Sequence, residues 1–310
     1  MISLFENNRN SDDIDVYLIG KDITDSNKRI LSEITKEYKR NITFFDIDKL
    51  PIPKYLENNG RWPSVCYARL FSPELLINVD RILYLDCDTL VIDEITELFT
   101  DKYSDYPIYG CKDFIGNWYK RLIGMPINAV NINGGVILLN LNKMRELNST
   151  KMITCFLNKY GGNISYADQD ILNGTFWNYI SVLDASYDVM SIMKVFKYKE
   201  IILLKHPKAC YTENEVNEAL KKPKIIHFTG NYRTIRPWFK NSNHPYRDQF
   251  EKYKNLSPWK NLELQEVKNS GEVAIANKIR NLPTWFSCNL LGFLYCVIRP
   301  LKIYLKGKNL

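Results

Sequence analysis

The sequence predicts an α/β fold built around a sheet of parallel strands. Short apolar runs alternate with segments of helical periodicity through the first half of the chain. One apolar run, residues 81–85, is continuous, which is typical of a strand buried on both faces. With 310 residues, of which 45% are hydrophobic and 25% charged, the chain can bury a large core.

Each element follows from a local pattern. Apolar runs predict strands at residues 16–19, 42–45, 81–85, 107–111, 136–141 and 224–228. Helical periodicity predicts helices at about 25–40, 64–76 and 142–160, and a further helix from about 168. We expect Asp25 or Ser26 to cap the first helix, Pro63 and Ser64 to open the second, and Asn142 to cap the third.

The pattern changes after Tyr253, and the composition changes again near residue 283. We therefore expect a catalytic domain over residues 1–255, a linker and helical extension over 256–282, and a tail over 283–310. The net charge of +7 is concentrated in this tail, because no acidic residue follows Glu272. The nearly neutral body argues against binding of nucleic acid.

The tail contains a 14-residue apolar run at 285–298, with basic residues on both sides. A membrane-spanning helix needs about 20 residues, so we expect an interfacial helix that contacts anionic lipid. A helix packed on the domain is the alternative. Seven cysteines form no CxxC pair and follow no signal peptide, which predicts reduced thiols and a cytoplasmic protein at the inner face of the membrane.

Four clusters of polar residues suggest chemistry. Asp86 and Asp88 directly follow the strand at 81–85, where two carboxylates can hold Mg²⁺ or Mn²⁺ against a diphosphate. A turn in which both side chains bind backbone amides is the alternative. Asn133, Gly134 and Gly135 lead into the next strand, where glycine allows close approach of a ligand or supplies a positive φ.

The third cluster is Asp168, Gln169 and Asp170, which either face a reacting sugar or form an acidic helix N-terminus. The fourth begins with His227 and Gly230. His227 is one of three histidines and is either a structural residue or a metal ligand. Arg233 and Arg236 follow, and their side chains can bind phosphate.

Together these clusters resemble glycosyltransferase family 8, in particular its bacterial lipopolysaccharide galactosyl- and glucosyltransferases. The resemblance covers residues 3–250, and five segments in the family's order support it. They are residues 66–70, 81–88, 131–141, 166–173, and 227–230 together with Pro237 and Trp238.

The resemblance implies a GT-A fold, which is a Rossmann-like mixed sheet flanked by helices, with a helical C-terminal extension. It implies transfer of glucose or galactose from a UDP-hexose, with retention, to a cell-envelope glycan, glycolipid or glycoprotein. Asp86, Asp88 and His227 would bind Mn²⁺ or Mg²⁺. Arg236, with Arg233 as a rival, would bind the diphosphate beside Gly230. The donor sugar would contact Arg69, Asn133, Gly134, Asp168 and Gln169.

An amide is a poor nucleophile, so the resemblance implies that Gln169 positions the reacting groups and that the acceptor attacks from the front face. Relative to the family, the first strand and its nucleotide-binding loop are missing before Met1. We therefore expect that Met1 is an internal residue of a longer natural protein.

Two other functions are compatible with parts of the sequence. Residues 86–90 resemble the DxDxT loop of haloacid-dehalogenase phosphatases, but that interpretation leaves the later clusters unexplained. A catalytically weak or inactive homologue that binds a nucleotide sugar is the second alternative, and the missing strand favours it.

Overall fold

The computed structural model describes residues 1–49, 63–161, 164–267 and 278–307. Its strands form three groups. β1 (Asp15–Gly20) and β2 (Asn41–Asp46) form a parallel pair. The second sheet has the order β3-β6-β5-β7, from strands Arg81–Leu85, Ile132–Asn140, Ile108–Lys112 and Ile180–Val182. The third has the order β4-β9-β8, from strands Thr89–Val91, Ile225–His227 and Val189–Met190.

The four-stranded sheet is mixed, so the parallel sheet that the strand–helix alternation predicts is wrong in detail. β6 lies between β3 and β5 and is antiparallel to both, whereas β5 and β7 are parallel. The alternation of elements along the chain does not encode their order in the sheet, which explains the error. A mixed sheet agrees with the family resemblance.

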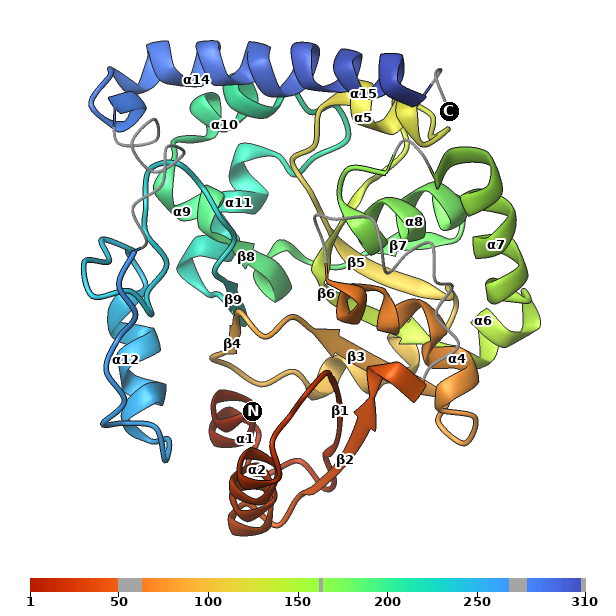
Figure 1. Ribbon diagram of the computed structural model, residues 1–310, viewed down its shortest axis with the longest axis vertical. Coiled ribbons are helices and arrows are strands. Elements are labelled where there is room, and N and C mark those ends of the chain that lie inside the picture. The colour runs from red at the N-terminus through yellow and green to blue at the C-terminus, as the bar shows by residue number, and fades with distance from the viewer. Residues whose placement is uncertain (50–62, 162–163, 268–277, 308–310) are drawn as a thin grey trace.

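Helices cover the sheets on both sides (Figure 1). In the first half they are α1 (Ile2–Asn7), α2 (Asp25–Glu37), the 3₁₀ helix Ser64–Phe71, α4 (Ser72–Leu75), α5 (Asn117–Leu122), α6 (Leu141–Glu146) and α7 (Ser149–Tyr160). In the second half they are α8 (Ala167–Phe176), α9 (Ser191–Val195), α10 (Tyr198–Lys205), α11 (Glu213–Lys221), α12 (Arg247–Asn255), α14 (Thr284–Phe293) and α15 (Arg299–Gly307). All six predicted strands and all four predicted helical regions are present. The short strands β4, β7 and β8 were not predicted.

Two helix boundaries differ from the sequence prediction. Thr24, rather than Asp25 or Ser26, caps α2, because its hydroxyl accepts the amide of Asn27. Asn140, rather than Asn142, caps α6 by accepting the amide of Lys143. The predicted helix 142–160 is divided into α6 and α7 because Asn148 adopts a left-handed conformation with φ 55°.

The tail forms one continuous helix rather than a 14-residue segment. Residues Thr284–Leu305 are 22 residues long, which by length and composition is enough to cross a membrane. A π-helical turn, Leu294–Ile298, precedes Pro300, where the missing N–H and the ring of proline would otherwise disturb an α-helix. This helix packs along α10 and α5 at the top of the molecule (Figure 1).

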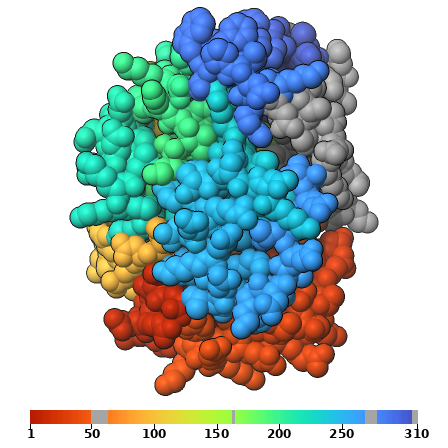
Figure 2. Space-filling model, turned by 90° about the vertical axis from the view of Figure 1, so that its left-hand side faces the viewer, coloured from red at the N-terminus to blue at the C-terminus, as the bar shows by residue number. Residues whose placement is uncertain are grey.

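The side view shows the segment after β9 and helix α12 covering the middle of one face, between the N-terminal region and the C-terminal helix (Figure 2). Among the described strands, β1 pairs with β2 alone and β3 pairs with β6 alone. The predicted linker 256–282 lies partly outside the described residues, and the three-part division of the chain stays a prediction.

Candidate metal and donor-binding site

Asp86 and Asp88 lie in a turn between two strands. β3 ends at Leu85, after which the amide of Asp86 donates to the carbonyl of Gly135 at 2.8 Å. The amide and hydroxyl of Thr89 both donate to the Asp86 carbonyl, at 3.2 and 2.7 Å. Thr89 then begins β4 and pairs with His227 of β9. This turn therefore brings both carboxylates beside a histidine that is distant in sequence.

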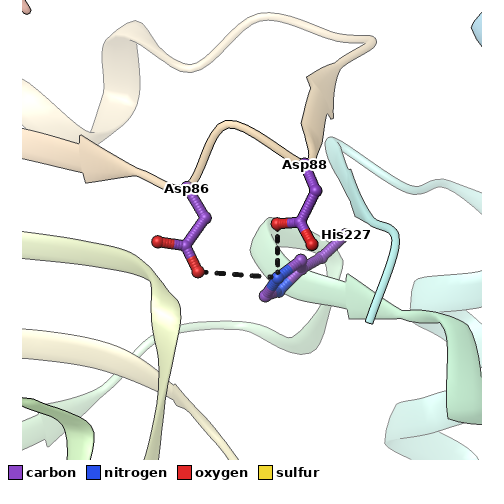
Figure 3. Close-up of side chains that lie close together, drawn as sticks. All are labelled: Asp86, Asp88 and His227. Carbon is purple, nitrogen blue, oxygen red and sulfur yellow. Dashed lines mark ion pairs between the residues drawn. The ribbon is translucent and has the colours of Figure 1, made fainter. Parts of the chain in front are cut away.

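Asp86, Asp88 and His227, which we call the metal cluster, point toward one another (Figure 3). Their ligand atoms all lie within 4.8 Å of one another. His227 Nε2 is 3.2 Å from Asp88 Oδ1 and 3.8 Å from Asp86 Oδ2. Two carboxylates and an imidazole form a donor set that suits a divalent ion such as Mn²⁺. The cluster can therefore hold a metal ion.

Gly135 makes room for the imidazole. A Cβ atom at residue 135 would overlap the ring of His227. Neither Gly134 nor Gly135 has a positive φ, so the alternative in which these glycines serve backbone conformation is wrong. The Gly135 amide donates to Asn133 Oδ1 at 2.8 Å, which fixes this segment beside the ring.

His227 is surrounded by carboxylates. Its side chain is buried, and Nδ1 lies 2.9 Å from Asp188 Oδ1. Burial lowers the pKa of His227, but Asp188 and Asp88 outweigh burial and raise this pKa to about 10. Burial raises the pKa of Asp88, but His227 and Arg236 lower it overall. A metal ion at Nε2 would take the place of the proton that these carboxylates hold there.

A second group, which we call the arginine cluster, contains Arg69, Tyr84 and Asp168. Arg69 is 5% exposed, and its Nε lies 2.5 Å from Asp168 Oδ2. Its Nη1 donates to the Gly134 carbonyl, and its Nη2 lies 3.3 Å from Asp86 Oδ1. The guanidinium stacks 3.7 Å from the centroid of the Tyr84 ring, and the Tyr84 hydroxyl donates to Asp86 Oδ1 at 2.8 Å. Asp86 thus joins the two clusters.

Gln169 is held at both ends of its amide. Oε1 accepts the amide of Gly134 at 2.9 Å, and Nε2 donates to Asp113 Oδ2 at 2.8 Å. Asp170 instead accepts the amides of Ser165 and Tyr166, at 2.6 and 2.8 Å. The expectation of an acidic residue that binds backbone amides at a helix N-terminus is therefore met by Asp170, whereas Asp168 faces Arg69.

The two arginines after β9 point in different directions. Arg236 Nη2 lies 3.2 Å from Asp88 Oδ2, and Gly230 lies close to the same guanidinium. Arg233 donates to the hydroxyl of Thr284 in α14. The fold therefore brings Arg236, but not Arg233, to the metal cluster.

Three residues at the site were missed in the sequence. Tyr84 is part of the apolar run 81–85, where it was counted as a strand residue. Asp113 directly follows β5, and this position at a strand end was the available signal. Asp188 lies in a stretch with no predicted element, where no local pattern distinguishes it.

The sequence model of glycosyl transferase family 8 matches residues 1–242, so this chain belongs to that family and is a glycosyltransferase. General stress protein A of Bacillus subtilis is 25% identical over 267 residues, which cover 84% of this chain and 89% of that protein. Lipopolysaccharide 1,2-glucosyltransferase of Escherichia coli is 26% identical over 278 residues, which cover 87% of this chain and 77% of that protein.

Solved structures show the same fold. The galactosyltransferase LgtC, in complex with donor and acceptor sugar analogues, matches with a TM-score of 0.67 and 22% identity, over 88% of this chain and 92% of that one. The glycosyltransferase GlyE of Streptococcus pneumoniae matches with a TM-score of 0.57 and 21% identity, over 84% and 57% of the two chains. The predicted α/β GT-A fold with a helical C-terminal extension is confirmed.

Proposed function

We propose that this chain transfers glucose or galactose from a UDP-hexose to a cell-envelope glycan, glycolipid or glycoprotein, with retention and in a Mn²⁺-dependent reaction. The metal cluster is the observation that supports this proposal. Asp86, Asp88 and His227 would hold Mn²⁺, or Mg²⁺ in its place. When bound, such an ion stabilises negative charge on a diphosphate leaving group.

Arg236 is suited to the diphosphate as well. Its side chain is 41% exposed and touches Asp88 at the edge of the metal cluster, so it can turn to a phosphate oxygen when a ligand arrives. Arg233 is a weaker candidate because it is engaged with Thr284. Gly230 leaves open space beside Arg236 for the approach of a phosphate.

The donor sugar would contact Arg69, Asn133, Gly134, Asp168 and Gln169. Gln169 holds a neutral amide that two hydrogen bonds fix in place, which suits a positioning residue better than a nucleophile. The acceptor hydroxyl would then attack from the front face and lose its proton to the departing phosphate. Gln169→Ala should lower turnover by less than about 10⁴-fold, and a larger loss would favour a covalent mechanism in which Gln169 is the nucleophile.

The test of the main proposal is a panel of UDP-sugars with Mn²⁺, monitored by release of UDP. We expect one UDP-hexose to react, and Asp88→Asn to lower the rate by about 10³-fold, because several kcal/mol of charge stabilisation are lost. Asp105→Asn, at an exposed residue, is the matched control and should react as the unaltered chain does.

Two results would favour the alternatives. Binding of UDP-sugar without turnover would indicate an inactive homologue. Release of phosphate from a phosphomonoester, without release of UDP, would indicate a phosphatase of the haloacid-dehalogenase type.

A peripheral membrane contact is the second part of the proposal. The buried face of the C-terminal helix includes Cys288, Leu291 and Cys296. Its outer face exposes a set of aromatic and aliphatic side chains, namely Trp285, Phe286, Leu290, Phe293, Leu294, Tyr295, Leu301, Tyr304 and Leu305. Lys278 and Lys302 add exposed positive charge. Such a face suits the interface of an anionic membrane.

Sedimentation with vesicles that contain an anionic phospholipid tests this contact. Replacing Trp285 and Phe293, which are 66% and 54% exposed, by serine should weaken binding and leave the fold intact. Removing residues 283–310 should move the protein from the membrane fraction to the soluble fraction. Unchanged sedimentation of both variants would contradict the contact.

A further inference from the structure

Asp188 is a buried carboxylate behind the metal cluster. It is the last residue of a 3₁₀ turn, Ala185–Asp188, and β8 begins at the next residue. β8 pairs with β9 in parallel, with Val189 opposite Ile226 and Met190 opposite His227. The amide of Lys224, just before β9, also donates to the Ser186 carbonyl at 2.8 Å. Asp188 and His227 are therefore held on adjacent, paired segments.

The surroundings of Asp188 do not favour a charged group on their own. The residue is 0% exposed. One oxygen, Oδ1, lies 2.9 Å from Nδ1 of His227, whereas Oδ2 has no hydrogen-bond partner among the described residues. Burying an ionised carboxylate costs several kcal/mol, and a single partner offsets only part of that cost. A purely stabilising role therefore explains this residue poorly.

Both ring nitrogens of His227 face carboxylates, which orient the imidazole. Nδ1 faces Asp188 on one side, while Nε2 faces Asp86 and Asp88 on the other. Gly135 closes one side of the ring, because any Cβ there would overlap it. The His227 carbonyl accepts the Ser191 hydroxyl at 3.2 Å, and that hydroxyl also lies 2.8 Å from His244 Nε2. Backbone and ring are thus both fixed.

We infer that Asp188 is a positioning residue for the metal site. It accepts the proton on Nδ1 of His227, which leaves the lone pair of Nε2 directed at the ion between Asp86 and Asp88. Partners of this kind fix the tautomer and orientation of a ligating histidine and raise its basicity. This inference rests on the proposed metal site and adds a residue outside the three that would touch the ion.

The first test measures Mn²⁺ affinity in the presence of UDP, from the electron paramagnetic resonance signal of free Mn²⁺. Asp188→Asn keeps the shape of the side chain and removes its charge. We expect Mn²⁺ to bind 10- to 100-fold more weakly, the usual effect of losing such a partner, and saturating Mn²⁺ to restore kcat. A defect in folding alone would not be restored in this way.

Asp184→Asn is the matched control. Asp184 lies at the start of the same turn, where its Oδ1 accepts the amide of Ser186 at 2.9 Å, and asparagine can keep that bond. This variant should bind Mn²⁺ as the unaltered chain does. Equal affinity in the Asp188→Asn variant would overturn the inference. Failure of the unaltered chain to bind Mn²⁺ would instead overturn the proposed metal site.

A second measurement needs no variant at Asp188 and decides the question if that variant does not fold. The protein with ¹⁵N-labelled histidine is titrated with Zn²⁺, a diamagnetic substitute, and long-range ¹H–¹⁵N correlations are recorded. The chain has three histidines, so His206→Asn and His244→Asn identify the signals. We expect a proton on Nδ1 of His227 and a Zn²⁺-dependent shift at Nε2. In the Zn²⁺-saturated protein, a proton on Nε2 with the ion at Nδ1 would overturn the inference.

Discussion

The metal cluster includes Asp86 and the arginine cluster contacts it, but the two clusters satisfy their charges in opposite ways. In the metal cluster, His227 faces Asp86, Asp88 and Asp188, so negative groups outnumber the imidazole. In the arginine cluster, a buried guanidinium already faces Asp168, the Gly134 carbonyl and Asp86. The excess negative charge of the metal cluster favours binding of an added cation, whereas the arginine cluster already contains the guanidinium of Arg69 as its cation.

The two carboxylate oxygens of Asp86 face different clusters. Oδ1 faces Arg69 and the Tyr84 hydroxyl, at 3.3 and 2.8 Å, whereas Oδ2 faces His227. The arginine cluster therefore orients one ligand of the metal cluster before any ion binds. The comparison teaches that a buried cation with its own carboxylate partner can serve as the rigid frame for a neighbouring site, here the proposed metal site.

The largest expected effect is on the arginine cluster. Arg69→Met would leave Asp168 buried without its partner and should lower the free energy of unfolding by about 3–5 kcal/mol. Urea unfolding at pH 7.5 measures this loss. Arg9→Met removes an exposed ion pair with Glu6 and should cost less than about 1 kcal/mol. Equal losses in the two variants would contradict the role of Arg69 as a frame.

The next effect is on the metal cluster. Gly135→Ala would displace the imidazole of His227 and should weaken Mn²⁺ binding by about 100-fold, as loss of ligand orientation does. Isothermal titration with Mn²⁺ and UDP measures the change. Gly161→Ala is the control, because a Cβ there meets nothing within 4 Å and the backbone is helical. Normal Mn²⁺ affinity in the Gly135 variant would show that the ring has room to move.

A smaller effect depends on pH. Burial raises the pKa of Asp168 to about 6, although Arg69 opposes this shift. Between the ordinary value of 3.8 and about 6, the folded chain keeps a proton that the unfolded chain releases. The free energy of unfolding should therefore fall as pH rises through this window, by roughly 2 kcal/mol from this residue. Urea unfolding at several pH values should show a shallower slope in Asp168→Asn, and an unchanged slope would contradict the assignment.

The smallest effect on stability is expected at the edge of the metal cluster. The ion pair between Arg236 and Asp88 is partly exposed, so Arg236→Ala should change the free energy of unfolding by less than about 1 kcal/mol. The affinity of the Arg236→Ala variant for UDP should nevertheless fall by about tenfold, because a charge-assisted hydrogen bond to phosphate is lost. Titration with UDP in the presence of Mn²⁺ measures this. Unchanged affinity for UDP would instead favour Arg233 as the residue that binds the diphosphate.

The sequence predicted the parts of the site that lie at strand ends. Asp86 and Asp88 could be found because two carboxylates directly follow an apolar strand, whereas His227 was assigned to the metal only through the family resemblance. Asp188 could not be found, because its role depends on the pairing of β8 with β9. The choice between Arg236 and Arg233 also needed the structure, since both arginines lie in one loop and only the tertiary fold directs them apart.

The fold shows the same division. The positions of the five longer strands and of β9 follow from local apolar runs, whereas the short strands β4, β7 and β8 and the antiparallel placement of β6 depend on contacts between distant segments. The break at Asn148 was missed because the residue type alone does not mark it, since asparagine occurs within helices as well as in left-handed turns. The π turn before Pro300 was missed because the apolar run that predicted the helix ends at residue 298 and carries no signal for a change of helix type.

Arg299 of the C-terminal helix lies between two aromatic rings, 5.8 Å from the centroid of Tyr119 and 5.5 Å from that of Tyr166. Tyr166 is the residue just before α8, whose first turn carries Asp168 and Gln169. A form of the enzyme shortened to improve its behaviour in solution would thus lose the cation that covers this tyrosine. Kinetic constants measured on such a form would describe a protein in which the start of α8 has lost this contact, so the 310-residue chain is the proper reference.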